Sequence, residues 1–491
     1  MDGDVIICKQ KIRIQACNEK LAFSCSQYIN EIANTELPKM FERIFHQTVR
    51  SDKVLKIDSI KIDIGSLAGD EFNDNFIRIV EQKIINELVK QFEANPQNTQ
   101  APESEGNDQW AQHEPAASLQ YVSQRQQNSS ALFYFLENGN YPWWYKKEQR
   151  QPPAELLAAL DAAEQSNLLL KLIPKARNSS AKDVEQLVKR LVNHLDDSAY
   201  NNYIDQIVGL FNNAAFKVNV DILLNQKEQF ISIFGITLKV FHEQVLSFVL
   251  LHADEGNFFK AFLNQLMSLF PVTKNEITNR INALDLNLAF HESLKGNIDT
   301  LNGSGDSSET LLNQKKAVRS SQPDKYDLYI ENAGLVLLHP FLPAYFHALK
   351  LTDENDQFIS AEAQTRAAVL LYYLQSGDEN YKEWEMALNK ILCGLPASEV
   401  IVNGIGLTEE EKEESRLLLQ TVIGYWEALK GSGIAALQNT FILREGKVTY
   451  KDDYWLIQVE RSGFDILLDR LPWGIGTIKL PWLKELIYCE W

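Results

Sequence analysis

Two long polar stretches divide the 491-residue chain and constrain its fold more than any other feature. Residues 93–128 are rich in Gln, Asn, Pro, Ser and Glu, and residues 302–325 are rich in Gly, Ser and Gln. Such segments bury too little apolar surface to offset the entropy that is lost when a chain becomes ordered. We therefore predict two flexible linkers, which separate three folded parts at residues 1–92, 129–301 and 326–491.

The first part is predicted to be a small α+β module. Val5 to Ile14 is β-branched and predicts a strand, and a second strand is predicted over Val54 to Ile64. In this second segment isoleucines alternate with Lys61 and Asp63, a pattern typical of a strand with one buried face. After Gly65, apolar residues recur every four positions and predict one face of a helix: Phe72, Phe76, Val80, Ile84 and Leu88.

The middle part, residues 129–301, has the pattern of helices separated by short breaks. The breaks are predicted at Pro152-Pro153, Pro174, Asn212-Asn213 and Pro271. Short helices with short connections favour stacked helical hairpins. The segment has neither a fixed repeat period nor a sustained heptad, so we predict neither a regular solenoid nor a long coiled coil.

The last part, residues 326–491, is predicted to be a second α+β module. Its clearest helix covers residues 408–430, with Thr408 and Glu411 forming a capping box and Gly431 ending it. A hairpin is predicted over Phe441 to Val459. The predicted fold is therefore mainly α and multi-domain, with helical hairpins in the middle and small α+β modules at both ends. The predicted buried stripe of the 408–430 helix consists of Leu418, Val422, Trp426 and Leu429.

Charge and hydropathy argue against nucleic-acid and membrane partners. The net charge of −18 repels phosphate groups, so we expect no nucleic-acid binding. The most apolar stretch, Phe230 to Leu251, is interrupted by Lys239, His242 and Glu243, and is not a clean bilayer span. The acidic N-terminus lacks the basic start of a signal peptide. We expect a soluble protein with no membrane insertion.

The motifs of common catalytic and metal sites are incomplete in this sequence. The five cysteines form no close pair, and zinc sites need close ligand pairs. His242-Glu243 and His291-Glu292 begin a zinc-protease pattern, but Leu246 and Lys295 occupy the positions of the second histidine. Gly431-Ser432-Gly433 follows a predicted helix, whereas a dinucleotide-binding loop follows a strand. We predict no catalytic residues, no metal, no cofactor and no enzyme activity.

Three short aromatic segments stand out as candidate partner-binding residues. Leu471-Pro472-Trp473 recurs as Leu480-Pro481-Trp482, and Tyr141-Pro142-Trp143-Trp144 combines the same residue types. Proline fixes a bend and tryptophan fills a core, so these segments can be structural. Rigid aromatic units also dominate interface energies, so they can dock a partner. Both interpretations stay open for Tyr141, Pro142, Trp143, Trp144, Leu471, Pro472, Trp473, Leu480, Pro481 and Trp482.

Four blocks of the sequence run from Lys56 to Gly65, from Phe135 to Trp144, from Glu331 to Pro343 with an extension from Asn389 to Pro396, and from Phe441 to Trp482. Together these blocks resemble the tape measure proteins of contractile injection systems. They run in the family's order along nearly the whole chain, although many members are much longer. Gln438 and Leu483 stand where an arginine and a methionine are expected.

This resemblance implies a structural assembly protein of a phage-tail-like particle. Such a protein would be assembled in the cytoplasm into the particle interior, where it would help set the length of the inner tube and sheath and dock at the baseplate hub. The implied partners are inner tube, hub and spike, baseplate and tube-cap proteins, and a homo-oligomer is also open. The alternative is a baseplate-associated helical adaptor or assembly initiator without a ruler role.

Overall fold

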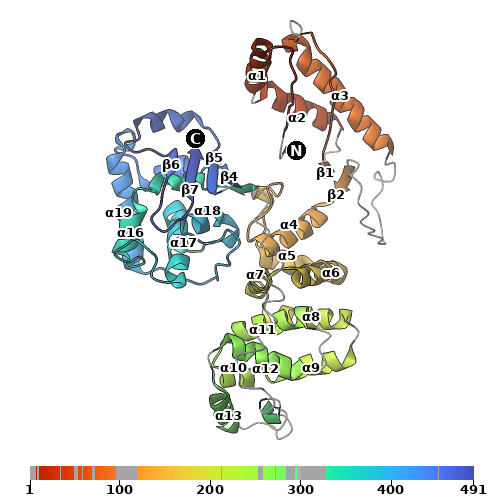
Figure 1. The fold of residues 1–491 in the computed structure, drawn as a ribbon, viewed down its shortest axis with the longest axis vertical. Coiled ribbons are helices and arrows are strands. Elements are labelled where there is room, and N and C mark those ends of the chain that lie inside the picture. The colour runs from red at the N-terminus through yellow and green to blue at the C-terminus, as the bar shows by residue number, and fades with distance from the viewer. Residues whose placement is uncertain are drawn as a thin grey trace. The chain divides into compact units, whose positions relative to one another are not determined.

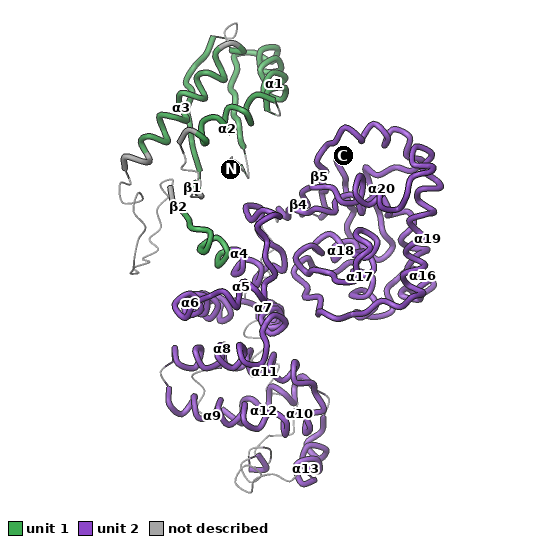
Figure 2. Tube along the Cα trace, turned by 180° about the vertical axis from the view of Figure 1, so that it is seen from behind, with its two compact units in different colours: residues 1–130 green, residues 131–491 purple. Residues whose placement is uncertain are grey.

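A computed structural model of the chain divides into two compact units, residues 1–130 and 131–491 (Figure 2). Each unit is described separately. The structure describes residues 7, 10–33, 35–48, 54–57, 59–68, 72–94, 119–211, 213–252, 258–270, 272–283, 294–296, 298, 327–451 and 453–491.

The first unit is a small α+β module, as predicted. The helices α1 (Glu19–Ala33), α2 (Glu36–Thr48) and α3 (Phe72–Ala94) enclose its core. All five residues of the predicted stripe on α3 are buried. The strand β1 (Val54–Ile57) pairs antiparallel with β2 (Leu119–Val122).

The second strand prediction in this unit was too long, and the first, Val5 to Ile14, has no counterpart in residues 7 and 10–14, the part of it that the structure describes. The second strand ends at Ile57 because β2 begins at Leu119, directly opposite it. A strand persists only while another strand lies opposite, and none does so for residues 59–64 within the described part of the unit. The predicted faces are nevertheless correct, since the isoleucines at 60, 62 and 64 are half-buried while Lys61 and Asp63 are exposed.

The predicted linker 93–128 also differs from the structure at both ends. Its first two residues complete α3, and its last ten residues include β2 and the start of α4 (Gln124–Asn138). Residues 95–118 lie outside the described residues, as does the whole of the second predicted linker, 302–325.

The second unit begins with a helical array, by which we mean residues 131–283 (Figure 1). One core connects its helices, and α11 packs against α6, α7, α8 and α10. Within the described residues no single helix meets the length and apolarity of a membrane span. Only α10 and α11 taken together do so, and they are bent by 108°. After α4 the helices are α5 (Pro153–Ala159), α6 (Ala162–Asn178), α7 (Ala181–Asn193), α8 (Asp197–Leu210), α9 (Ala214–Asn225), α10 (Lys227–Phe234), α11 (Leu238–Leu251), α12 (Phe258–Leu269) and α13 (Lys274–Ala283).

One of the predicted breaks in the array was wrong. Pro153 begins α5 and Asn213 caps α9, as the sequence indicates, whereas Asn212 and the predicted break at Pro271 lie outside the described residues. Pro174, however, lies inside α6. Proline removes the hydrogen bond to the carbonyl four residues earlier, at Leu170. Both residues are exposed on the outer face of α6, where water can replace that bond.

The remainder of the second unit, residues 327–491, is called the C-terminal part. Its sheet has the order β3-β4-β5-β7-β6, in which only β5 and β7 run parallel. The predicted hairpin is confirmed as β4 and β5. The strands are β3 (Asp327–Ile330), β4 (Gly446–Lys451), β5 (Tyr454–Val459), β6 (Thr477–Ile478) and β7 (Leu486–Glu490), and the helices are α16 (Leu342–Ala348), α17 (Ala361–Ser376), α18 (Ala387–Leu392), α19 (Glu409–Tyr425) and α20 (Ile434–Leu437).

The helix predicted over residues 408–430 is α19, and it ends five residues early. Its capping box is present, since Glu411 N donates to Thr408 Oγ1 at 3.2 Å and Thr408 N donates to Glu411 Oε2 at 2.7 Å. The helix stops because Trp426 turns out of it into an extended conformation, in which its ring is fully buried. All four residues of the predicted stripe are buried.

Candidate interaction site

The Tyr141–Trp144 segment lies where the helical array meets the C-terminal part. Tyr141 is buried, its hydroxyl donates to Gln151 O at 2.5 Å, and its ring centroid lies 5.7 Å from that of Trp384. Burial raises the pKa of Tyr141, so its phenol stays neutral. Pro142 is also buried. Tyr141 and Pro142 therefore act as core residues.

Trp143 and Trp144 are half-buried beside them. The Trp143 ring lies 6.4 Å from Tyr329 on β3, and the Trp144 ring lies 6.2 Å from Tyr145. Such separations are typical of aromatic pairs that contribute to packing. Within the described residues, no ring contact or hydrogen bond joins this segment to either Leu-Pro-Trp repeat.

The first Leu-Pro-Trp repeat holds the end of a buried 3₁₀ helix, Ala333–Leu338. The indole Nε1 of Trp473 donates to Leu337 O at 3.1 Å, and its ring lies 5.0 Å from Phe341. Leu471 and Trp473 are half-buried, whereas Pro472 is exposed. The carbonyls at a helix end lack partners within the helix, so the indole satisfies one of them.

The second repeat does the same at the end of α18. Trp482 Nε1 donates to Leu392 O at 2.8 Å, and the ring lies 5.0 Å from Phe358. Leu480 is buried and Pro481 is exposed. Both repeats thus place proline outside and an indole on a helix-terminal carbonyl, while the leucine is half-buried in the first repeat and buried in the second. The repetition in sequence reflects a repeated contact in the structure.

A buried ionic cluster in the second unit consists of residues that were not among the candidate partner-binding residues of the sequence analysis. Arg190 on α7 and Lys390 on α18 are 0% exposed, and both contact Glu383, whose side chain is 3% exposed. Arg190 Nε donates to Glu383 Oε1 at 3.0 Å, and Lys390 Nζ donates to the same oxygen at 3.3 Å. We call Arg190, Glu383 and Lys390 the junction cluster.

Backbone carbonyls complete the junction cluster from both sides. Arg190 Nη1 donates to Leu136 O and Glu137 O, each at 3.1 Å, where α4 ends, and Arg190 Nη2 donates to Ser398 O. Lys390 Nζ donates to Ala397 O at 3.3 Å. The negative end of the α4 dipole thereby faces a cation, which is a favourable arrangement.

Gly139 leaves the space that the junction cluster needs. Its φ is +76°, and a Cβ atom there would lie 2.6 Å from Arg190 Nη2 and 2.9 Å from Glu383 Oε1. The sequence interpretation of Gly139 as a helix stop is correct, but its second role depends on residues 51 and 244 positions further along the chain. No local pattern indicates such a contact.

Burial perturbs two basic groups at this junction. It lowers the pKa of Lys390 to about 8, although the nearby Glu383 opposes the shift. It also lowers the pKa of the half-buried His194 to about 4. At neutral pH Lys390 therefore stays largely protonated, and the neutral imidazole of His194 lies close by.

The shift at His194 predicts a stability change with pH. Because the folded pKa of about 4 lies below the usual 6.5, the unfolded chain binds the extra proton between these values. The stabilisation is full above pH ~6.5 and is lost as the pH falls towards ~4, by up to about 3 kcal/mol. His194→Gln should flatten this part of a urea-unfolding series, whereas His347→Gln, at an exposed site, should not. Equal acid sensitivity in both variants would contradict the assignment.

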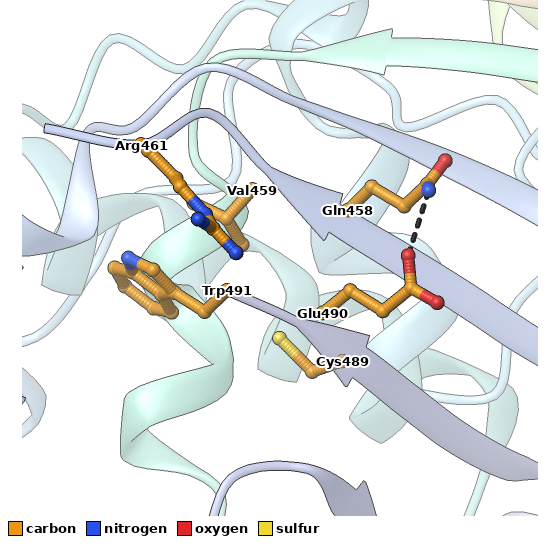
Figure 3. A pocket seen from close by; sticks show the side chains of 6 residues that line it. All are labelled: Gln458, Val459, Arg461, Cys489, Glu490 and Trp491. Carbon is orange, nitrogen blue, oxygen red and sulfur yellow. Dashed lines mark hydrogen bonds between the residues drawn. The ribbon is translucent and has the colours of Figure 1, made fainter. Parts of the chain in front are cut away.

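A shallow hollow of about 480 Å³ lies beside β5 and β7 (Figure 3). Gln458 Nε2 donates to Glu490 Oε2 at 2.7 Å on one side, and Arg461 lies near Trp491 on the other. Burial raises the pKa of Cys489 to about 12, so its thiol is protonated at neutral pH and is a weak nucleophile. Within the described residues no group of three or more His, Cys, Asp or Glu side chains is arranged to hold a metal. The side chains that line this hollow do not form a recognisable arrangement of catalytic acid, base and nucleophile.

Comparison with known proteins gives one match that covers almost the entire chain. The model of the contractile injection system tape measure protein family matches residues 4–491. No curated protein and no solved structure matches the chain. The match includes the junction cluster and every candidate residue named above, and it confirms the family that the four sequence blocks indicate. The chain therefore belongs to the contractile injection system tape measure protein family.

Proposed function

We propose that this tape measure protein helps set the length of the inner tube and sheath, and that it docks at the baseplate hub. The family match across residues 4–491 carries this proposal. The helical array lies in sequence between two α+β modules, an order that suits modules that dock and a middle that spans. The proposed partners are hub and spike, inner tube, baseplate and tube-cap proteins, met during cytoplasmic assembly into the particle interior.

A ruler role requires the helical array to rearrange. An α-helix rises 1.5 Å per residue, so residues 153–283 drawn into one rod would reach roughly 200 Å. In the structure these residues form short helices that share one core. Extension would therefore have to break helix–helix contacts, compensated by contacts with the particle.

A second candidate function is a compact adaptor or assembly initiator at the baseplate. The observation in its favour is the shared core of the array, together with the buried ionic contact to the C-terminal part. A protein that stays in this compact form would not set the length of the inner tube by its own extension. The two candidates differ in what should happen when helices are removed.

The test is a series of whole-helix deletions read out as tube length in electron micrographs. Removing α8 and α9, with 14 and 12 residues, should shorten a continuous helical span by roughly 40 Å. A ruler predicts tubes shorter in proportion to the deletion. An adaptor predicts either unchanged length or no particles, and unchanged length across several folded deletions would refute the ruler.

The same particles can test the candidate docking residues. We propose that the exposed prolines Pro472 and Pro481, with the half-buried rings of Trp473, Trp482, Trp143 and Trp144, contact partner proteins, and that the buried Tyr141, Pro142 and Leu480 support them. Replacing both exposed prolines by alanine removes rigid surface without emptying the core. Lower incorporation of a folded double variant supports docking there, and normal incorporation refutes it.

A further inference from the structure

We propose that the junction cluster is a latch that holds the helical array against the C-terminal part, and that opening it separates the two. The role of this opening in the particle rests on the proposed ruler function. The latch itself concerns only the second unit, and it can be tested on the isolated protein.

The cluster joins two parts that have separate cores. One core runs from Ala131 to Ile298 and the other from Leu328 to Cys489. Arg190 comes from the first part, whereas Glu383 and Lys390 come from the second. Trp384 is one of few apolar side chains of the C-terminal part that pack on the other core. Polar contacts therefore accompany the aromatic contacts of Trp384 at this junction.

The neighbouring contacts across the junction are polar as well. Val400 N donates to Gln186 Oε1 at 2.6 Å, and Gln186 Nε2 donates to Glu399 Oε1 at 3.0 Å. Further along, Lys147 Nζ lies 2.7 Å from Glu331 Oε2, and Arg150 pairs with the same carboxylate. Such contacts favour one docking geometry, because a hydrogen bond forms only when donor and acceptor are both close and aligned.

A cluster of this composition selects one docking geometry for the two parts, but it contributes little net free energy to keeping them together. Removing charges from water costs several kcal/mol per ion, and the attraction between the charges offsets this only when each is paired. Here two buried cations share one carboxylate oxygen. On opening, all three groups regain water, so separation recovers part of the cost of burial. An apolar junction of equal size would have no such compensation.

Glu383→Gln is the sharpest test, because it removes the carboxylate that both buried cations contact and keeps the side-chain shape. We expect the junction to open in the full chain. Hydrogen exchange at residues 139–150 and 396–400 should rise at least about tenfold, and the radius of gyration should increase. Exchange in α11 and β5, which lie in the two cores, should stay unchanged.

The matched control replaces all three charges, as Arg190→Met, Glu383→Met and Lys390→Met together. Apolar replacement of a buried ionic cluster is often neutral or stabilising. The carbonyls of Leu136, Glu137, Ser398 and Ala397 lose their donors in this variant, which offsets part of that gain. It should therefore stay closed to a clearly greater extent than Glu383→Gln, in which two buried cations lose their carboxylate. The latch is overturned if Glu383→Gln leaves exchange at the junction unchanged, or if exchange rises equally in α11 and β5, which would mean one cooperative unit. It is also overturned if the triple variant opens as widely as Glu383→Gln.

Failure of the latch and failure of the ruler are distinguishable. If helix deletions leave tube length unchanged while Glu383→Gln still opens the junction, the ruler fails and the latch stands. If the deletions shorten tubes and the junction stays closed in Glu383→Gln, the ruler stands and the latch fails. Where both hold, particles carrying the closed triple variant should have abnormally short tubes.

Discussion

Gly334→Ala is expected to destabilise the C-terminal part by more than about 3 kcal/mol. Gly334 lies in the buried 3₁₀ helix Ala333–Leu338, and a Cβ atom there would lie 1.6 Å from Phe441 O and 2.8 Å from Ile442 Cα. These are backbone atoms, so no side-chain rotation relieves the overlap. Overpacking of a core costs about 1–3 kcal/mol when side chains can move, and the cost here should exceed that range.

The measurement is hydrogen exchange of β4 and β5 in the full chain. A loss of more than about 3 kcal/mol accelerates exchange through unfolding by more than about a hundredfold. Gly424→Ala is the matched control, because Gly424 lies in α19 with no atom within 4 Å of its would-be Cβ. That change should be neutral or stabilising by about 0.5–1 kcal/mol, since alanine favours a helix. Similar exchange rates in the two variants would contradict the argument.

Local patterns in the sequence predicted most of the secondary structure of this protein. The capping box of α19 and the stripe on α3 depend only on residues a few positions apart, and both were correct. The end of α19 was wrong because Trp426 leaves the helix to reach Leu467, a contact across 41 residues. Pattern analysis gives no information about such a distant partner.

The candidate aromatic residues were easier to find than to interpret. The Leu-Pro-Trp repeat is visible in the sequence, but the carbonyls that Trp473 and Trp482 satisfy belong to Leu337 and Leu392, more than 80 residues away. Repetition therefore identified a real structural unit without indicating what it contacts.

The junction cluster escaped prediction for a different reason. Arg190 follows Leu187 and Val188 on an amphipathic helix, a position that usually points a charged side chain to solvent. It is buried because Glu383 arrives from 193 residues further along the chain. Lys390 lies within the block Asn389 to Pro396, which resembles the family, but this resemblance does not indicate which side chain Lys390 contacts. Buried charge pairs depend on tertiary contacts, and these are not encoded in local periodicity.

Trp426→Ala is expected to cause the largest loss of stability among the tryptophan variants. Its ring is 0% exposed, its centroid lies 4.6 Å from that of Phe441, and its Nε1 donates to Leu467 O at 3.1 Å. Truncation removes the ring, leaves a cavity and orphans a carbonyl, with an expected cost of about 3–5 kcal/mol. Since the carbonyl of Phe441 lies next to Gly334, both substitutions disturb the surroundings of Phe441.

Two companion variants separate the contributions of volume and hydrogen bond. Trp426→Phe keeps most of the ring and loses the donor to Leu467, so it should cost about 1–3 kcal/mol. Trp473→Ala removes a ring that is only half-buried, so its cost should fall below that of Trp426→Ala. Denaturant unfolding with hydrogen exchange in β4 and β5 gives the order. If Trp473→Ala proves as destabilising as Trp426→Ala, the first Leu-Pro-Trp repeat is as much a part of the core as Trp426, and its proposed role in docking loses its basis.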